Sequence, residues 1–338
     1  MSKRVCILRW GAYGDAVIMT PLLSLYKNDG WHVTVNVNKR CEEVLRHNPN
    51  IDKFVIYEDN TVPNDKLEEY WAEIAKQYDK FVNLSESIEG TLLKCKGRPD
   101  YELSYDKIRK TCDINYYDKT LEIGGYGNES GLNGELFFSQ FEESETMSRL
   151  SKDIGKFKIL WSLAGSSFHK AYPYAEYVAI AFLNKHPDAM IYTVGDELAG
   201  LLEWQHPRTR NLCGKLGIRK TFNMTKHCDL VIAPETGVLN AAGCYDTAKI
   251  ALLSHSSENN LTKYFKNCFN IRANIPCQPC HKMHYDLGSC PIDPVTAGTA
   301  CMAKIEPDRV FGAMEKVYQD WRNDGLYDRT GKQRVLCA

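Results

Sequence analysis

The sequence predicts an α/β protein with two Rossmann-like domains, each built on a doubly wound parallel sheet. Strand-like and helix-like segments alternate along residues 4–85 and again from residue 157, and a less periodic, charged stretch separates the two series. Alternation of this kind places parallel strands in one sheet with helices on its faces. A chain of 338 residues is long enough for two such domains.

The first series gives the N-terminal domain, residues 1–150. Its strand-like segments are residues 4–10, 31–38, 52–57 and 79–85, and its helix-like segments are residues 15–27, 41–47 and 64–78. Residues 86–150 are rich in tyrosine, glycine and charge, so we expect loops and short helices around a site there. The charged residues 142–156 are the expected linker.

The second series gives a domain over residues 151–305. Its expected strands are residues 157–163, 189–195, 209–214, 229–234 and 248–254, and its expected helices are residues 174–185, 219–228 and 238–245. Residues 306–338 hold a last helix, over about 307–323, with an apolar side. That side consists of Val310, Met314, Val317, Tyr318 and Trp321.

Composition excludes several classes of protein. A net charge of −1 argues against a generally basic nucleic-acid or membrane-surface protein. No apolar run is long enough to span a bilayer, and the start of the chain lacks the pattern of a cleavable signal. Thirteen cysteines, an odd number, fit a reducing compartment better than a disulfide framework. We therefore expect a cytoplasmic protein.

The stretch "RWGAYGDAVIMTPLL" places a carboxylate at a corner between a strand and a helix. Gly11 ends the strand-like run, and Gly14 and Asp15 precede the helical spacing. Asp15 is either a helix N-cap or a proton acceptor at the carboxyl edge of the sheet, where ligands of doubly wound folds bind. The spacing Gly-x-x-Gly-Asp departs from the Gly-x-Gly-x-x-Gly of dinucleotide folds and disfavours NAD.

Three loops of the second domain carry groups that suit a nucleotide. "DLVIAPETGVLNAAGC" opens a helix at which the N–H groups of Thr236, Gly237 and Val238 form either an anion site or a plain capping turn, with Glu235 or Thr236 as the cap. "LAGSSFHKAYP" brings Gly165, Ser166 and Lys170 to the same sheet edge, where small residues and a cation suit phosphate. Glu197 is either a ligand for ribose hydroxyls or an ordinary acid at a helix start.

A cysteine-rich segment follows the last expected strand. Cys277, Cys280, Cys290 and Cys301 have the spacing C-x2-C-x9-C-x10-C, and four thiolates can close a structural zinc or iron site. His281 or His284 could replace one ligand. The alternatives are thiols without a metal or disulfides.

These elements, in this order, resemble the ADP-heptose:lipopolysaccharide heptosyltransferases, glycosyltransferase family 9. The resemblance implies a GT-B architecture, two Rossmann-like domains facing a cleft, with the last helix packing back on the first domain. It implies a catalytic carboxylate at Asp15, beside Gly14, and a ribose ligand at Glu197. The implied donor-binding residues of the second domain are Gly165, Ser166, Lys170, Leu216, Glu235, Thr236, Gly237, Val238 and Asn240. Glu235 stands where the family has Asp, and Asn240 where it has His.

The implied activity is that of an inverting glycosyltransferase, most simply one that moves heptose from ADP-heptose to a saccharide hydroxyl. Asp15 would be the general base, because an aspartate with a reference pKa of about 3.9 is ionised at neutral pH. No catalytic metal is required, since Lys170 and the helix start can stabilise the leaving diphosphate. The alternatives are another nucleotide sugar, a protein or modified nucleic acid as acceptor, an NAD(P)-linked Rossmann enzyme, or a non-catalytic binding module.

Overall fold

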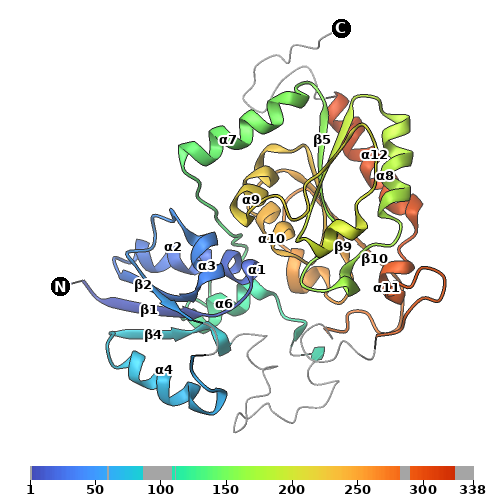
Figure 1. The fold of residues 1–338 in the computed structure, drawn as a ribbon. Coiled ribbons are helices and arrows are strands. Elements are labelled where there is room, and N and C mark those ends of the chain that lie inside the picture. The colour runs from blue at the N-terminus through green and yellow to red at the C-terminus, as the bar shows by residue number, and fades with distance from the viewer. Residues whose placement is uncertain (1, 59–60, 87–108, 111, 282–289, 324–338) are drawn as a thin grey trace. The chain divides into compact units, whose positions relative to one another are not determined.

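The computed structural model describes residues 2–58, 61–86, 109–110, 112–281 and 290–323 (Figure 1). The chain divides into two compact units. Unit 1 comprises residues 1–138, 256–264 and 279–288, and unit 2 comprises residues 139–255, 265–278 and 289–338. Each unit contains one parallel sheet, so the predicted α/β class is confirmed.

The sheet of unit 1 has the strand order β3-β2-β1-β4, and all its strands are parallel. The strands are β1 (Arg4–Arg9), β2 (His32–Asn38), β3 (Lys53–Tyr57) and β4 (Lys80–Asn83). Central β1 pairs with β2 from Arg4↔His32 to Arg9↔Val37. The order reverses between β1 and β4, and in open α/β sheets ligands bind at the carboxyl ends of the strands at such a switch point.

Helices cover the sheet of unit 1. They are α1 (Tyr13–Ile18), α2 (Thr20–Asn28), α3 (Lys39–Leu45), α4 (Leu67–Ala75) and α6 (Tyr116–Gly124), with 3-10 turns η1 (Asn64–Lys66) and η2 (Leu84–Glu86). Figure 1 shows α4 below the strands and α2 and α3 above them. Residues 256–264 of this unit contain η7 (Glu258–Thr262).

The sheet of unit 2 has the order β10-β9-β8-β5-β6-β7, again all parallel. Its strands are β5 (Phe157–Ser162), β6 (Ala189–Val194), β7 (Thr209–Asn211), β8 (Leu230–Pro234), β9 (Ala248–Leu253) and β10 (Cys268–Arg272). Counted from β5, this is the 3-2-1-4-5-6 order of a dinucleotide-binding fold, with its switch point between β5 and β8. The sequence did not predict β10, because its five residues lie in a polar setting without a clear apolar run.

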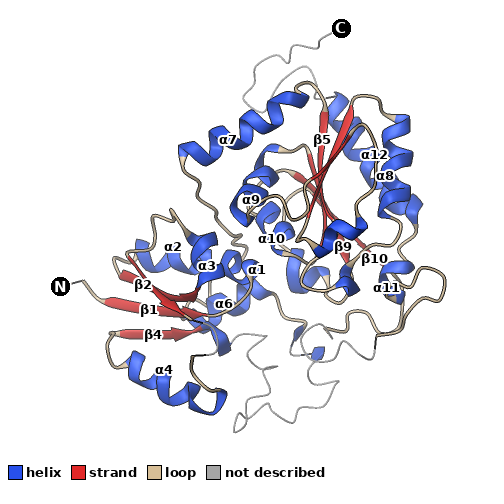
Figure 2. Ribbon diagram, viewed as in Figure 1, coloured by secondary structure: helices blue, strands red, loops and turns tan. Residues whose placement is uncertain are grey.

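The helices of unit 2 cover both faces of its sheet (Figures 1 and 2). They are α7 (Gln140–Leu150), α8 (Ala175–Lys185), α9 (Ile218–His227), α10 (Gly237–Gly243), α11 (Ala300–Ala303) and α12 (Pro307–Asn323). The 3-10 turns are η4 (Ser151–Asp153), η5 (Phe168–Lys170) and η6 (Leu198–Leu202). Among the described residues, no helix combines the length and apolar character that crossing a bilayer requires.

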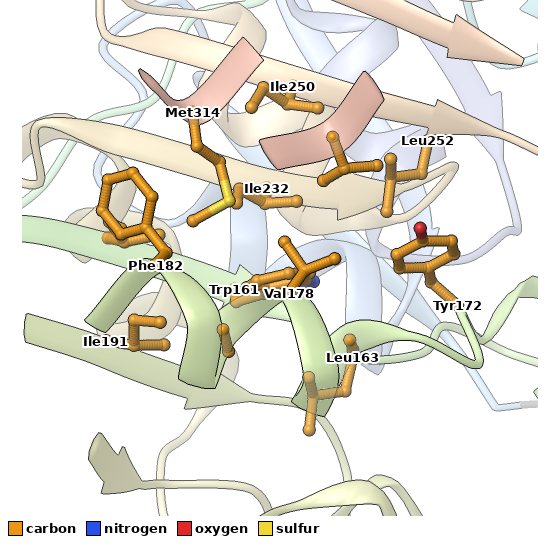
Figure 3. Packing of buried hydrophobic residues seen from close by; sticks show 14 of the residues in the cluster. Trp161, Leu163, Tyr172, Val178, Phe182, Ile191, Ile232, Ile250, Leu252 and Met314 are labelled. Atoms are coloured by element: carbon orange, nitrogen blue, oxygen red, sulfur yellow. The ribbon is translucent and has the colours of Figure 1, made fainter. Parts of the chain in front are cut away.

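Helix α12 packs in the core of unit 2, which differs from the expectation that the last helix packs on the first domain. Figure 3 shows the side chain of Met314 of α12 ending between Phe182 of α8 and the strand residue Ile232. The apolar side of α12 is buried there, with Val310 and Met314 at 0% exposure. The physical reason is that the face of this sheet is apolar and α8 leaves part of it to be covered. Residues 324–338 lie outside the described part of the chain.

The expected linker is wrong for residues 142–150, because they belong to helix α7. Ser139 begins this helix with a capping box: its side chain accepts from the N–H of Glu142, and the Glu142 carboxylate accepts from the N–H of Ser139. The acidic side chains of α7 pair with basic side chains of α9. The pairs are Glu142 with Arg219, Glu143 with Lys226 and His227, and Glu145 with Lys220. The charge that suggested a linker therefore joins two helices.

Candidate functional site

The bend between β1 and α1 carries the candidate base. Helix α1 starts at Tyr13 with Ala12 as its N-cap, so Asp15 is the third residue of the helix rather than its cap. Gly14, expected just before the helix, lies in the same first turn. The bend lies at the carboxyl end of β1, at the switch point of the unit 1 sheet.

Both oxygens of the Asp15 carboxylate have a donor. Oδ2 accepts from the backbone N–H of Ala12 at 2.6 Å, and Oδ1 lies 2.8 Å from Nη2 of Arg9. The two side chains are 14% and 8% exposed. The capping interpretation is thus partly right, because the carboxylate accepts from the backbone N–H of the N-cap residue Ala12. A simple cap would not need an arginine at the other carboxylate oxygen.

The backbone at the bend fits closely against this carboxylate. A Cβ atom on Gly11 would lie 2.3 Å from Asp15 Oδ2, so any side chain at this position would force the Asp15 carboxylate to move. The carbonyl of Gly11 accepts from Asn38 Nδ2 at 3.0 Å, and Trp10 donates from Nε1 to Asn36 Oδ1 at 2.9 Å. Trp10 also stacks on Tyr57, with ring centroids 3.6 Å apart. Neighbouring strands therefore hold the bend in place.

A small pocket opens beside the carboxylate. One side is polar, from helix α6, and the other is apolar, from α1, its C-cap Met19, and η2. Asn115 caps α6 by accepting from the N–H groups of Tyr117 and Asp118, which fixes the first turn that carries Tyr116. The pocket is lined by Arg9, Asp15, Ile18, Met19, Leu84, Tyr116 and Thr120. The cavity borders the Asp15 carboxylate and is about large enough for one water-sized group.

The loops after β5 and β8 meet at the switch point of the unit 2 sheet. Lys170, at the end of η5, is 8% exposed, and its Nζ donates to the carbonyl of Glu235 at 2.8 Å. A Cβ atom on Gly165 would lie 2.7 Å from Thr236 Cγ2. The structure thus brings Gly165, Lys170 and Thr236 together, and Ser166 beside them is exposed.

The Glu235 carboxylate faces inward. Oε1 accepts from the backbone N–H groups of Ser254 and His255 at 2.7 and 3.0 Å, and Oε2 accepts from Ser254 Oγ at 2.8 Å. Glu235 is 6% exposed. Its side chain therefore holds the loop after β9, and we see a structural reason for glutamate at a position where the resembled family has the shorter aspartate.

Thr236 is the N-cap of α10, as one of the two interpretations of this turn expected. Its side chain accepts from the N–H of Leu239 at 3.4 Å, and Gly237 and Val238 form the first turn. Asn240 is 6% exposed and donates from Nδ2 to the carbonyl of Thr236 at 3.4 Å. Its Oδ1 is buried, and no described residue donates to it.

Glu197 and Leu216 lie on the loops that follow β6 and β7. Glu197 is exposed and is the N-cap residue of η6, but its side chain makes no capping hydrogen bond. Gly214 approaches it closely, since a Cβ there would lie 2.8 Å from Glu197 Cγ, and Gly214 has a left-handed φ of 68°. Leu216 is half-buried.

The four cysteines of the predicted metal site do not form a ligand cluster. In the described part of the chain, no three His, Cys, Asp or Glu side chains are arranged to hold a metal ion. Cys280 belongs to unit 1, whereas Cys277, Cys290 and Cys301 belong to unit 2, because the chain passes between the units in this segment. His281 is fully buried, with Nε2 3.5 Å from Asp113 Oδ1, and His284 lies outside the described residues. The metal-site prediction is not supported.

Three polar residues of the pocket were missed by sequence reasoning, namely Arg9, Tyr116 and Thr120, as were its apolar residues Ile18, Met19 and Leu84. Arg9 lies six residues before Asp15, at the end of an apolar strand, where a charged side chain is unusual. That buried position was a usable signal. Tyr116 and Thr120 had none, because their approach to Asp15 depends on how α6 packs against α1.

Comparisons with known proteins give a family and a fold. Residues 129–290 match the model of "Glycosyltransferase family 9 (heptosyltransferase)". Lipooligosaccharide heptosyltransferase 2 of Campylobacter jejuni is 24% identical over 166 residues, 46% of this chain and 49% of that protein. The chain thus matches about half the length of this curated relative. The resemblance to family 9 is confirmed over the matched residues.

Solved structures resemble nearly the whole chain. ADP-heptose lipopolysaccharide heptosyltransferase II of E. coli superimposes with a TM-score of 0.66 at 15% identity, over 94% of this chain and 99% of that one. TibC, a dodecameric iron-containing heptosyltransferase solved with ADP-D-β-D-heptose, gives 0.63 at 12% identity, over 96% and 79%. At these identities the likeness establishes the fold, which is that of the heptosyltransferases.

Proposed function

Since residues 129–290 carry the sequence of glycosyltransferase family 9, we propose that this chain is an inverting glycosyltransferase. It moves a sugar from a nucleoside-diphosphate donor to an acceptor hydroxyl. The observation that carries the proposal is the Asp15 carboxylate, which lines a pocket at the switch point of the unit 1 sheet. Direct displacement at the anomeric carbon needs one base on the acceptor side, and Asp15 supplies it.

Asp15 takes the proton of the acceptor hydroxyl as its oxygen attacks the anomeric carbon of the donor. The bond from that carbon to the diphosphate breaks, and the anomeric configuration inverts. The carboxylate is suited to this role because its two oxygens are oriented by Arg9 and Ala12 while it still borders open space.

Unit 2 supplies the groups for the donor in this proposal. Lys170 stabilises the charge that grows on the departing diphosphate, together with the N–H groups of Thr236, Gly237 and Val238. Gly165 and Ser166 allow close backbone approach, and Glu197 binds the ribose hydroxyls. Support comes from the convergence of the β5 and β8 loops at the switch point, where doubly wound folds bind nucleotides. Glu235 acts indirectly here, by holding the loop after β9.

The donor we propose is an ADP-sugar, most simply ADP-heptose, and the acceptor a saccharide. Support for the donor comes from the matched family and from the ADP-heptose complex of TibC. No residue of this mechanism requires a metal, and the four cysteines enter no step. A cytoplasmic location remains part of the proposal, because an odd number of cysteines fits a reducing compartment.

A thermal-shift screen of the full chain tests the donor class. ADP-, UDP-, GDP- and CDP-sugars are compared, with NADH as the control for a dehydrogenase. Ligand at a hundred times its Kd stabilises the folded state by about 2.7 kcal/mol. We expect stabilisation by ADP-heptose and by ADP. Stabilisation by NADH without any nucleotide sugar would overturn the proposal.

A further inference from the structure

We propose that Arg9 is a positioning residue for Asp15: it holds the carboxylate in its orientation and keeps it ionised, so that the base works over a wider range of pH. The inference rests on the proposed function of Asp15. Its basis is the set of contacts within unit 1 that Arg9 makes with Asp15 and with Leu84.

The guanidinium of Arg9 is fixed at both ends. Nη2 lies 2.8 Å from Asp15 Oδ1, and Nη1 donates to the carbonyl of Leu84 at 3.3 Å. Leu84 is the first residue of η2, directly after β4, the strand beside β1. Arg9 therefore connects the carboxyl ends of the two strands that flank the switch point, and the planar fork of an arginine suits such a two-ended contact.

Burying the Arg9–Asp15 ion pair costs free energy, because both groups lose hydration. The Arg9 side chain is 8% exposed and the Asp15 side chain 14%. Two ions held out of water lose hydration that their attraction only partly restores, and replacing such a pair by apolar residues is often neutral for stability. A buried pair at the wall of a pocket is therefore explained better by the site than by the stability of the fold.

The carboxylate is oriented without being enclosed. Oδ2 is fixed by the N–H of Ala12, and Oδ1 by Arg9. Because Asp15 also lines the pocket, its orientation is set by the protein and its reactivity faces the pocket.

The charge of Arg9 opposes the effect of burial on Asp15. Desolvation favours the protonated acid, which cannot accept a proton, whereas a cation within about 4–6 Å favours the carboxylate. The elements packed around Asp15 carry three further groups that are uncharged at neutral pH, Tyr13 on α1, Cys41 on α3 and Tyr116 on α6. The charged groups on α3 include Arg40 and Glu43, which act on Tyr13 with opposite signs, and on α6 Asp118 pairs with Lys263 and Lys119 with Glu122. Arg9 is the cation in direct contact with the Asp15 carboxylate.

The experiment measures kcat/KM of the full chain with ADP-heptose, or with whichever nucleotide sugar the screen selects, from pH 5 to pH 9. The variants are Arg9→Met, which keeps the length and removes the charge, and Arg9→Lys, which keeps the charge. Arg4→Met is the matched control, because Arg4 lies on the same strand and donates from Nη2 to the carbonyl of Gln77, away from Asp15. Donor Kd and melting temperature are recorded for each variant.

We expect Arg9→Met to lower kcat/KM at least about tenfold at pH 6 and less at pH 8, with the acid limb displaced to higher pH and donor Kd unchanged. Arg9→Lys should restore the acid limb of the wild type while turnover stays below it, because an ammonium does not reproduce the fork. Arg4→Met should match the wild type.

An equal loss at every pH in both Arg9 variants would overturn the proposal and make Arg9 merely structural. Unchanged kcat/KM in Arg9→Met would do the same. If Arg9→Met fails to fold, Arg9→Lys decides: a displaced acid limb despite the retained charge contradicts the proposal. Absence of transfer by the wild-type protein would instead count against the proposed function, so the two failures are distinguishable.

Discussion

Asp15 and Glu235 are acids beside the switch points of two parallel sheets, and their surroundings differ. Each follows a parallel strand next to a switch point, β1 in unit 1 and β8 in unit 2. Asp15 has one backbone N–H and one guanidinium, and it lines a pocket. Glu235 receives two backbone N–H groups and one hydroxyl, all from the loop after β9. Topology places both carboxylates beside a switch point, and their local partners distinguish them: Asp15 borders a pocket, and Glu235 holds the loop after β9.

The sharpest test of this difference is Asp15→Asn. Turnover should fall at least about a hundredfold, because an amide cannot accept the proton and a general base contributes about 10²–10⁴-fold. The amide oxygen can still accept from Ala12 or Arg9, so donor affinity should be retained and the melting temperature should change little. Steady-state kinetics, donor calorimetry and a melting curve on the same preparation check this. Retained turnover would show that Asp15 is only a helix cap.

Glu235→Ala should lower the stability of the fold and leave turnover nearly unchanged. Loss of three hydrogen bonds to a buried carboxylate leaves the N–H groups of Ser254 and His255 unsatisfied, so the free energy of unfolding should fall by about 3 kcal/mol. Urea denaturation measures it, and turnover per folded molecule should stay within about threefold of the wild type. Glu235→Gln keeps one acceptor oxygen, so its free energy of unfolding should lie between those of the wild type and Glu235→Ala. A stable Glu235→Ala protein without turnover would instead make Glu235 a direct ligand.

Glu142 and Arg219 form a partly buried carboxylate–guanidinium pair like that of Asp15 and Arg9, but neither lines the pocket. The hydrogen bond from Arg219 lowers the pKa of Glu142 to about 2, against an ordinary value of 4.5. Because folding lowers this pKa, the ionised Glu142 carboxylate stabilises the fold at pH values above 4.5. This stabilisation is lost as the pH falls from 4.5 towards 2.

Glu142→Ala should therefore destabilise the fold by about 2 kcal/mol at pH 7 and by little near pH 2, without changing the pH profile of turnover. Melting curves across this range measure the effect. The matched control is Glu145→Ala, whose pair with Lys220 is more exposed and should contribute less than about 1 kcal/mol. Equal losses in both variants at pH 7 would contradict the importance of burial for this pair.

The smallest effect expected is that of Lys170→Ala. Binding of ADP should weaken about tenfold, whereas binding of adenosine should hardly change, because the ammonium acts on the diphosphate. Calorimetry with both ligands makes the comparison. Equal weakening of both would mean that Lys170 acts only through its bond to the Glu235 carbonyl.

Sequence reasoning succeeded where a pattern repeats along the chain. The strands of both sheets, except β10, and the helix Pro307–Asn323 follow from apolar periodicity. It failed for α7, where acidic residues looked like a linker until α9 supplied their partners, and for the surface on which α12 packs. The acidic residues of α7 and the apolar side of α12 indicate that each helix packs against another element, but the sequence does not indicate which element that is.

The sequence by itself determined the fold class, the alternation of strands and helices along the chain and the resemblance to family 9, because these depend on local spacing and on short motifs. Only the tertiary structure decided which groups each acid contacts. Arg9 reaches Asp15 across the bend, Tyr116 approaches it from a helix about a hundred residues away, and Ser254 and His255 enclose Glu235 from the next strand. The physical reason is that desolvation and hydrogen-bond geometry act between atoms that are close in space, and residue spacing along the chain does not record which atoms those are.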